Sequence, residues 1–528
     1  MLFSSMAAFA VDGTVTYTES QDSGQTIQKT IYKDSLIINN FDAENTYKSL
    51  IKVSNSNNQE TIKNCFYQDK EIASALKEAK ERFEQSNVTV SYNTYDKLID
   101  SGKLNDFYYV YLAYKMANIG FFSLAEKSIK NIDNKNLWQD YTEELKRYYM
   151  PKSKLSYEEE MFLANIYTSI YYNNLTRESI FDLMKKDKIM RRSDYAEYLA
   201  ASAFYIEKDY TKALGMINRA CSQNSDNVYY MKYKARILTE LEKYNEALNI
   251  IEDIENKKLK MVDADNTANT KGLKYLILSK NEKNEFKSKL YLAKYFYINN
   301  AQDRALKELS GVQYKSKMPE ISTLMGDIYF YQKDYKKAQN AYNVALMFNK
   351  RCSSAFKGLG NINLAQNTFS TAKEYYEKAY HYNKQDEDTL LNLAIASFAQ
   401  NDIKSARKYA DIAQSVSSKD NYKIYYVQAK LKPEKSAQYL DKALLINPLY
   451  ADTWFDLGDI ALAKSDINTA EKYIANGNFL AQGSYKYYYY ISKIDDKLNK
   501  KQEAEQNMQE AVNMYAKDNP QKEISEVK

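Results

Sequence analysis

The chain has 528 residues, of which 44% are hydrophobic and 27% charged, and it contains only 13 Gly and 5 Pro. So few turn-forming residues exclude a fold built of many strands and hairpins, whereas abundant Lys, Glu, Ala, Leu and Asn favour helices with polar outer faces. The net charge is 74 − 69 = +5 with the signs interspersed, which argues against nucleic-acid binding because that function gathers Lys and Arg in a stripe.

Tyrosine is unusually frequent, with 51 residues. Two explanations stay open: an A/T-rich genome, which raises Tyr, Asn, Lys and Ile together, and selection for an aromatic binding surface. Cys65, Cys221, Cys352 and the single His381 are far apart in the sequence. They offer neither metal-ligand spacing nor a histidine-based catalytic arrangement, so we interpret them as packing or surface residues.

Residues 1–10 are apolar or small and end in Ala8-Phe9-Ala10, which fits a signal-peptidase site. A positively charged start is missing, so we interpret this segment as the remnant of a longer signal peptide. We therefore expect a bacterial protein exported to the periplasm, the envelope or the medium. The alternative is an apolar helix start in a cytoplasmic protein. The chain has no run of 18 or more apolar residues, so we expect no membrane span.

Residues 11–65 are predicted to be a linker or cap. Thr14–Thr18 and Ser35–Ile38 have the composition of strands, and Ala43–Lys52 that of a helix. Residues 66–193 are predicted to be divergent helical repeats.

Further along, a small residue recurs at a nearly constant interval. The steps from Ala213 to Ala247, from Ala338 to Ala372 and from Ala372 to Ala406 are each 34 residues. Such a period predicts stacked helix pairs. We assign regular repeats to residues 194–256 and 285–516.

Two places depart from the period. The step from Ala406 to Ser436 is 30, a shortening at Lys430–Pro433, and the gap from Ala247 to Ala305 is 58, which is 24 more than one period. Residues 257–284 are therefore predicted to be a loop or insertion, either a hinge or a tolerated insertion. Residues 517–528 are predicted to be a polar tail.

The repeats resemble the tetratricopeptide pattern. Trp454, Leu457 and Gly458 match its opening W-x₂-L-G, although Ala461 replaces the expected Tyr, and Pro448 matches its terminal proline. The resemblance implies an all-α fold, a right-handed superhelical solenoid of antiparallel helix pairs, preceded by a short irregular N-terminal segment. It also implies close helix–helix contacts at the recurring small residues and at the residues that match the tetratricopeptide motif. These structural positions are Gly326, Ala338, Gly360, Ala372, Ala394, Ala406, Trp454, Leu457, Gly458 and Ala470.

In proteins of this resemblance, the first helix of each pair lines a concave groove that holds a protein or peptide partner. The implied groove positions here are Tyr195, Tyr198, Tyr205, Tyr229, Lys232, Arg236, Lys294, Tyr297, Thr323, Asp327, Phe330, Tyr331, Lys357, Asn361, Phe455 and Asp459. This mixture of aromatic and singly charged side chains suits an extended peptide or helix. The alternative is that the aromatic residues partly cover the core and that the interface lies elsewhere.

No nucleotide-binding, zinc-protease or nucleophile-elbow motif is present in the sequence. Glu158-Glu159-Glu160 is interpreted as a solvated helix start. We therefore expect no enzyme activity, cofactor or metal, and predict a protein-interaction scaffold in an exported or envelope-associated assembly. A cytoplasmic adaptor and, more remotely, a hydrolytic or glycan-processing enzyme are the alternatives.

Overall fold

The computed structural model describes residues 14–20, 26–32, 70–172, 176–257, 270–299, 301–417, 421–481 and 484–518. The chain divides into two compact units, unit 1 with Gln302–Lys528 and Met1–Thr46, and unit 2 with Tyr47–Ala301. The predicted signal-peptide remnant, the second predicted strand, the helix predicted over Ala43–Lys52 and Cys65 lie outside the described residues.

The described N-terminal residues form a β-hairpin. Strand β1 (Thr14–Ser20) pairs antiparallel with β2 (Thr26–Tyr32), with Thr14 opposite Tyr32. The strand predicted over Thr14–Thr18 is confirmed. Part of the segment predicted to be irregular is therefore regular.

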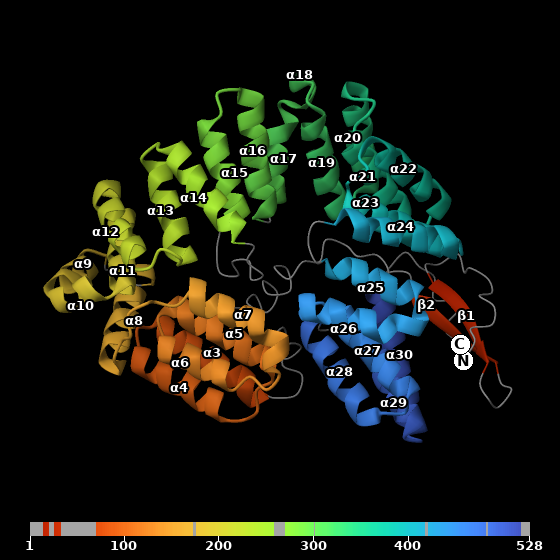
Figure 1. Cartoon of the computed structure of the whole chain (residues 1–528), viewed down its shortest axis with the longest axis horizontal. Helices are drawn as coiled ribbons and strands as arrows, with labels where there is room; N and C mark the ends of the chain where they lie inside the picture. The colour runs from red at the N-terminus through yellow and green to blue at the C-terminus, as the bar shows by residue number, and fades with distance from the viewer. Residues whose placement is uncertain are drawn as a thin grey trace. The chain divides into compact units, whose positions relative to one another are not determined.

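Unit 2 is helical throughout its described residues (Figure 1). Its helices are α3 (Lys70–Glu84), α4 (Val88–Asp100), α5 (Asp106–Ile119), α6 (Phe122–Lys130), α7 (Lys135–Tyr148), α8 (Tyr157–Tyr171), α9 (Thr176–Lys185), α10 (Asp187–Arg192), α11 (Asp194–Ile206), α12 (Tyr210–Gln223), α13 (Val228–Glu240), α14 (Tyr244–Asn256), α15 (Thr270–Asn281) and α16 (Glu285–Ile298).

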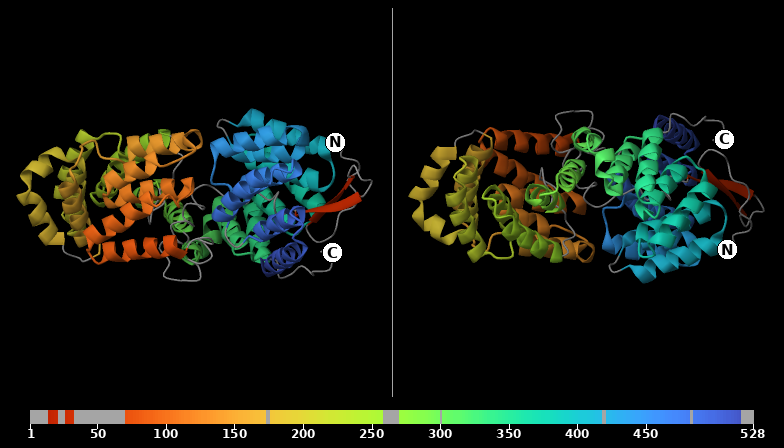
Figure 2. Two further views of the ribbon diagram at one scale, coloured as in Figure 1. Left: turned by 90° about the horizontal axis from the view of Figure 1, so that it is seen from below. Right: turned by 90° about the horizontal axis from the view of Figure 1, so that it is seen from above.

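Beyond its hairpin, unit 1 is also built of helix pairs, which stack side by side in both views of Figure 2. Its helices are α17 (Gln302–Ser310), α18 (Gln313–Ser316), α19 (Pro319–Tyr331), α20 (Tyr335–Phe348), α21 (Ser353–Ala365), α22 (Phe369–Tyr382), α23 (Glu387–Ala399), α24 (Ile403–Val416), α25 (Tyr422–Leu431), the 3₁₀ helix η2 (Pro433–Lys435), α26 (Ser436–Ile446), α27 (Ala451–Ala463), α28 (Ile467–Leu480), α29 (Tyr485–Lys497) and α30 (Lys501–Asp518). Among the described residues, no helix is long and apolar enough to cross a membrane.

The predicted loop over 257–284 is wrong in part, because α15 occupies residues 270–281. This helix packs against α16: Ser288 Oγ donates a hydrogen bond of 2.7 Å to the Ser279 carbonyl, and the Tyr275 and Tyr291 rings stack at 6.2 Å between centroids. The extra residues therefore include a further helix. The repeat block predicted over 285–516 is also divided, since the boundary between the units falls after Ala301.

The turn inside each pair repeats with the helices. Lys333, Asn367 and Asn401 all have φ near +60° and are 34 residues apart, and each precedes the second helix of its pair by two residues. The next residue often caps that helix, as when Asp334 accepts a hydrogen bond from the Lys337 amide. Because a capping side chain satisfies an otherwise unpaired helix amide, the turn is specified locally.

Small residues make room for a large side chain from the second helix. An added Cβ on Gly326 would lie 2.4 Å from the Tyr342 ring, and one on Gly360 would lie 2.5 Å from Tyr376. The neighbour that limits space at Gly326 is Tyr342, which lies one helical turn beyond the small residue Ala338 of the same helix. All the predicted structural positions are nonetheless buried.

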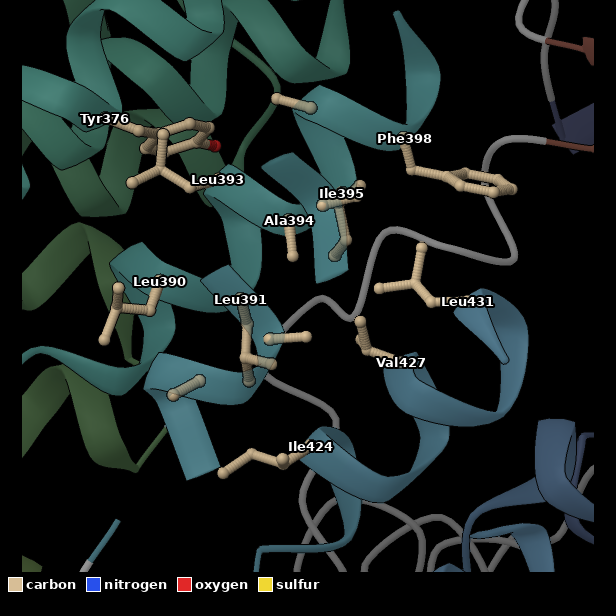
Figure 3. Close-up of a cluster of buried hydrophobic side chains, with 14 of the residues drawn as sticks. Tyr376, Leu390, Leu391, Leu393, Ala394, Ile395, Phe398, Ile424, Val427 and Leu431 are labelled. Atoms are coloured by element: carbon tan, nitrogen blue, oxygen red, sulfur yellow. The ribbon is translucent and has the colours of Figure 1, made fainter. Parts of the chain in front are cut away.

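The core of unit 1 continues from pair to pair. Figure 3 shows Leu390, Leu391 and Ala394 of α23 between Tyr376 of α22 and Val427 of α25. These side chains are at most 2% exposed. Each pair thus buries its apolar side against the next pair, as a solenoid requires.

The predicted shortening at Lys430–Pro433 corresponds to a shorter first helix. Helix α25 has 10 residues where α23 has 13, and the 3₁₀ turn η2 follows it. The first helix is thus 13 − 10 = 3 residues shorter, which is about one helical turn.

Candidate partner-binding surface

The predicted groove positions differ in their exposure. Tyr195, Lys232 and Phe455 are buried, at 4%, 5% and 1% exposed, so their prediction as partner-contacting residues is wrong for this structure. Thr323 is also buried, at 7%. The reason is packing between neighbouring helices. The Phe455 ring stacks on Tyr490 at 5.8 Å between centroids.

The other predicted positions keep part of their surface exposed. Tyr331 is 63% exposed, and the rest are half-buried: Tyr198, Tyr205, Tyr229, Arg236, Lys294, Tyr297, Asp327, Phe330, Lys357, Asn361 and Asp459. Their assignment as partner contacts stays a prediction.

In unit 2 the predicted tyrosines contact one another. The Tyr198 ring stacks on Tyr230 at 5.2 Å and meets Tyr233 edge-on at 5.4 Å, and Tyr233 in turn meets Tyr205 at 5.5 Å. Burial raises the pKa of Tyr198, Tyr230 and Tyr233 well above the ordinary tyrosine value, so these hydroxyls stay neutral. Tyr230 and Tyr233 are not among the groove positions predicted from the sequence. These tyrosines are partly buried against one another, which favours the alternative that the aromatic residues partly cover the core and that the interface lies elsewhere.

In unit 1 the polar positions are held by tyrosines of the second helix. The Tyr342 hydroxyl donates to Asp327 Oδ1 at 2.8 Å, and the Tyr376 hydroxyl donates to Asn361 Oδ1 at 2.8 Å. Burial raises the pKa of Asp327 to about 6, against the lowering effects of the Tyr342 hydrogen bond and the Lys357 charge. Asp327 and Asn361 therefore already have intramolecular partners.

Ion pairs link the first helices of adjacent repeats. Lys357 Nζ lies 3.0 Å from Asp386 Oδ2, and Lys493 Nζ lies 2.7 Å from Asp459 Oδ1. A third pair joins Lys486 Nζ and Asp452 Oδ1 at 2.6 Å. The charges of these three pairs are therefore compensated within the chain.

The sequence analysis missed Lys486, Lys493 and Asp452. The 34-residue period contained the signal, since Asp452 and Lys486, and likewise Asp459 and Lys493, are one period apart. Oppositely charged residues at the same repeat position on adjacent first helices are expected to meet.

Glu160 departs from the interpretation of Glu158-Glu159-Glu160 as a solvated start. Ser156 and Glu159 form a capping box there, whereas Glu160 is only 3% exposed. It accepts hydrogen bonds from the Ser123 amide at 3.0 Å and the Ser123 hydroxyl at 2.7 Å. Burial raises the pKa of Glu160 to about 7 despite these bonds. The carboxylate joins α8 to the start of α6.

The cysteines and the histidine lie apart in the described part of the chain. Cys352 is buried, and burial raises the pKa of the half-buried Cys221 to about 11. His381 is exposed and packs edge-on against Tyr382. The described residues contain no group of three or more His, Cys, Asp or Glu placed to hold a metal ion.

Three family models match the chain. The model for anaphase-promoting complex, cyclosome, subunit 3 matches residues 171–254, and two tetratricopeptide repeat models match residues 323–387 and 363–423. A comparison with curated proteins finds no match.

Solved structures with the same kind of repeats are similar over parts of the chain. A chain of the APC/C hetero-tetramer Cut9–Hcn1 is 12% identical, with 87% of this chain and 96% of that chain covered and a TM-score of 0.37. A tetratricopeptide repeat protein from Parabacteroides merdae ATCC 43184 is 15% identical over 51% and 94%, with a TM-score of 0.29. The type IV pilus biogenesis factor PilW is 15% identical over 39% and 96%, with a TM-score of 0.33. With TM-scores this low, the matches carry no argument about the partner.

The two tetratricopeptide models cover α19 to the start of α25, where the 34-residue recurrence of turns, small residues and helix pairs is most regular. The third model covers α9 to α14, where the same recurrence is present. The chain contains tetratricopeptide repeats over residues 323–423.

Proposed function

We propose that this protein is an interaction scaffold that holds an extended peptide or a helix of a partner protein along the first helices of its repeats. The observation that carries the proposal is the composition of that surface in unit 1. Aromatic side chains such as Phe330 and Tyr331 of α19 keep exposed area there, while charges on other first helices of the unit pair with each other, as Asp459 of α27 does with Lys493 of α29.

Such a surface favours partners through aromatic contact area. Tyrosine supplies a large apolar face with a polar end at low conformational cost. Since the ion pairs between repeats are already satisfied, a strongly charged peptide would have to break them to gain its own. The proposed partner segment is therefore amphipathic and of low net charge.

Tyr331 allows a sharp test. Tyr331 is 63% exposed at the end of α19, which is the first helix of its pair. Tyr314 in the short helix α18 is also 63% exposed, but α18 is not the first helix of a pair. Neither substitution removes core packing. Cross-linked pull-downs from the native host are made with wild type, Tyr331→Glu and Tyr314→Glu.

We expect Tyr331→Glu to lose at least one partner that Tyr314→Glu retains. If both variants retain every partner, the assignment of the binding surface is wrong. Tyr198→Glu is a weaker probe because Tyr198 packs against Tyr230, so loss of binding there would not separate contact from folding.

We also propose that the scaffold acts outside the cytoplasm. The support is the sequence Ala8-Phe9-Ala10 before Val11. Mass spectrometry of the native protein is expected to find a mature chain that begins at Val11. A native chain that retains Met1 would favour the cytoplasmic adaptor instead.

A further inference from the structure

One short segment of this protein carries a marked excess of positive charge. Residues 185–192 contain five Lys or Arg against the single acid Asp187, 5 − 1 = +4. The charge distribution is thus less even than the interspersed signs suggested. The cations are Lys185, Lys186, Lys188, Arg191 and Arg192, and all five are exposed.

The segment lies at the edge of unit 2. It comprises the end of α9 and all of α10, and both views show these helices at the periphery of that unit (Figures 1 and 2). Leu183 and Met190, at 0% and 6% exposed, anchor the helices to the core and leave the opposite side outward.

Two large apolar side chains accompany the cations. Phe181 is 59% exposed and Met184 is 41% exposed. Arg177, Phe181 and Lys185 follow at four-residue intervals, so they form one row on the outward side of α9. The Lys185 ammonium lies 3.8 Å from the centre of the Phe181 ring. The outward side of α9 is thus apolar at its centre and basic towards α10.

The acids nearby compensate part of this charge. Arg192 pairs with Glu159 of α8, and Arg177 pairs with Glu207 at 2.9 Å; Glu178 and Asp182 are exposed on α9 itself. The excess over these acids comes from the lysines at 185, 186 and 188, which form no ion pair with any carboxylate whose side chain the structure describes.

We propose that the outward side of α9 and α10 binds the surface of an anionic lipid bilayer. Phe181 and Met184 would enter the boundary between headgroups and acyl chains, and the lysines would reach the anionic headgroups with their extended side chains. Charge complementarity supports this occupant, because clusters of about 4–8 Lys or Arg on an amphipathic helix are typical of binding to anionic lipids.

A bilayer fits this surface better than an acidic peptide does. The residues occupy the outward side of two short helices rather than an enclosed site, and a flat surface can reach all of them at once. The exposed Phe and Met have no role in recognising an acidic chain, whereas they add apolar area to membrane binding. This inference is independent of the partner held on the first helices.

The test is co-sedimentation of the full-length protein with vesicles. Vesicles of phosphatidylcholine containing about one third phosphatidylglycerol are compared with vesicles of phosphatidylcholine alone, at low and high salt. The expected result is binding to the anionic vesicles that weakens with salt, because screening shortens the range of the lysine charges.

The charge variant is Lys185→Gln/Lys186→Gln/Lys188→Gln. Each lysine near an anionic surface is expected to contribute about a 5-fold factor in affinity, so this variant should bind about 100-fold more weakly. Phe181→Ser should weaken binding about 10-fold through lost apolar area. The matched control is Lys336→Gln/Lys404→Gln/Lys408→Gln, which removes three exposed lysines of unit 1 and should bind as wild type does.

Three results would overturn the proposal: no binding to anionic vesicles at low salt, equal binding to both kinds of vesicle, or equal loss in the charge variant and its control. Binding of soluble poly-glutamate without binding to vesicles would assign the surface to an acidic protein instead. Circular dichroism of each variant confirms that the helices are retained.

Discussion

Gly326→Ala tests whether the contact between the helices of one pair is set by Tyr342. The new methyl group would lie 2.4 Å from the Tyr342 ring, and this ring is 1% exposed. It also has little room to move away, because the ring lies equally close to a second helix, where a Cβ on Gly358 would be 2.2 Å from it. The helices must therefore separate to accommodate the methyl group.

The magnitude follows from two opposing effects. Replacing Gly by Ala within a helix stabilises it by about 1 kcal/mol, whereas overpacking a dense core costs about 1–3 kcal/mol. With a contact this short we take the upper part of that range, so the expected net loss is about 1–2 kcal/mol.

Gly215→Ala is the matched control. Gly215 lies within α12, is exposed, and has nothing within 4 Å of an added Cβ. The same substitution there should stabilise the protein by about 0.5–1 kcal/mol, because only the helix propensity changes. The two variants are therefore predicted to shift stability in opposite directions.

The assay is urea unfolding followed by circular dichroism, together with hydrogen exchange of the amides in α19 and α20. The local readout is needed because stacked repeats do not always unfold as one unit. Faster exchange in α19 and α20 for Gly326→Ala, without change there for Gly215→Ala, is expected. If both variants stabilise the protein equally, the argument from the Tyr342 contact is refuted.

Three further predictions concern single residues. Glu160 has a pKa of about 7 in the folded state against an ordinary 4.5, so the folded state binds this proton more tightly than the unfolded state does. The free energy of unfolding should therefore fall by about 3 kcal/mol as pH rises from about 4.5 to 7. Urea titrations should show that Glu160→Gln removes this fall, and an unchanged pH profile in the variant would contradict the prediction. Lys333→Gly should raise the thermal midpoint of unit 1 with a gain of about 0.5 kcal/mol, because φ is +60° there, whereas no gain would mean that the turn carries no strain. Asp194→Ala should cost about 3 kcal/mol in urea unfolding, since the buried carboxylate accepts hydrogen bonds from the Lys152 amide, the Ser153 hydroxyl and the Asn224 side chain; a cost below about 1 kcal/mol would show that these groups find other partners.

Much of the fold was predictable because its determinants repeat. Ala338, Ala372 and Ala406 are each 0% exposed at the 34-residue interval that the sequence shows. The weaker repeats were also readable, since Ala113 and Ala125 lie buried in the consecutive helices α5 and α6. A helix pair depends mostly on contacts within about 34 residues, so a sequence pattern of that length carries the information.

The helix α15 was not predicted, because its first turn follows a polar stretch and its apolar spacing is irregular. Only its packing against α16 through Ser279 and Tyr275 identifies it as part of the stack. The candidate surface was predicted less well for a related reason. Tyr195 and Phe455 occupy positions that the repeat register assigns to the surface, and only the neighbouring side chains decide that they are buried.

The sequence by itself determined the repeat length, the class of fold, the positions of the small residues and the shortened pair at Lys430–Pro433. These are local properties, because helix period, turn chemistry and steric size act within one helix pair. The tertiary structure alone decided that Tyr342 sets the contact at Gly326, that Asp459 pairs with Lys493, and that Glu160 is buried. Those outcomes depend on which side chains come into contact between helices and between repeats, and these contacts are set by tertiary packing rather than by the local sequence.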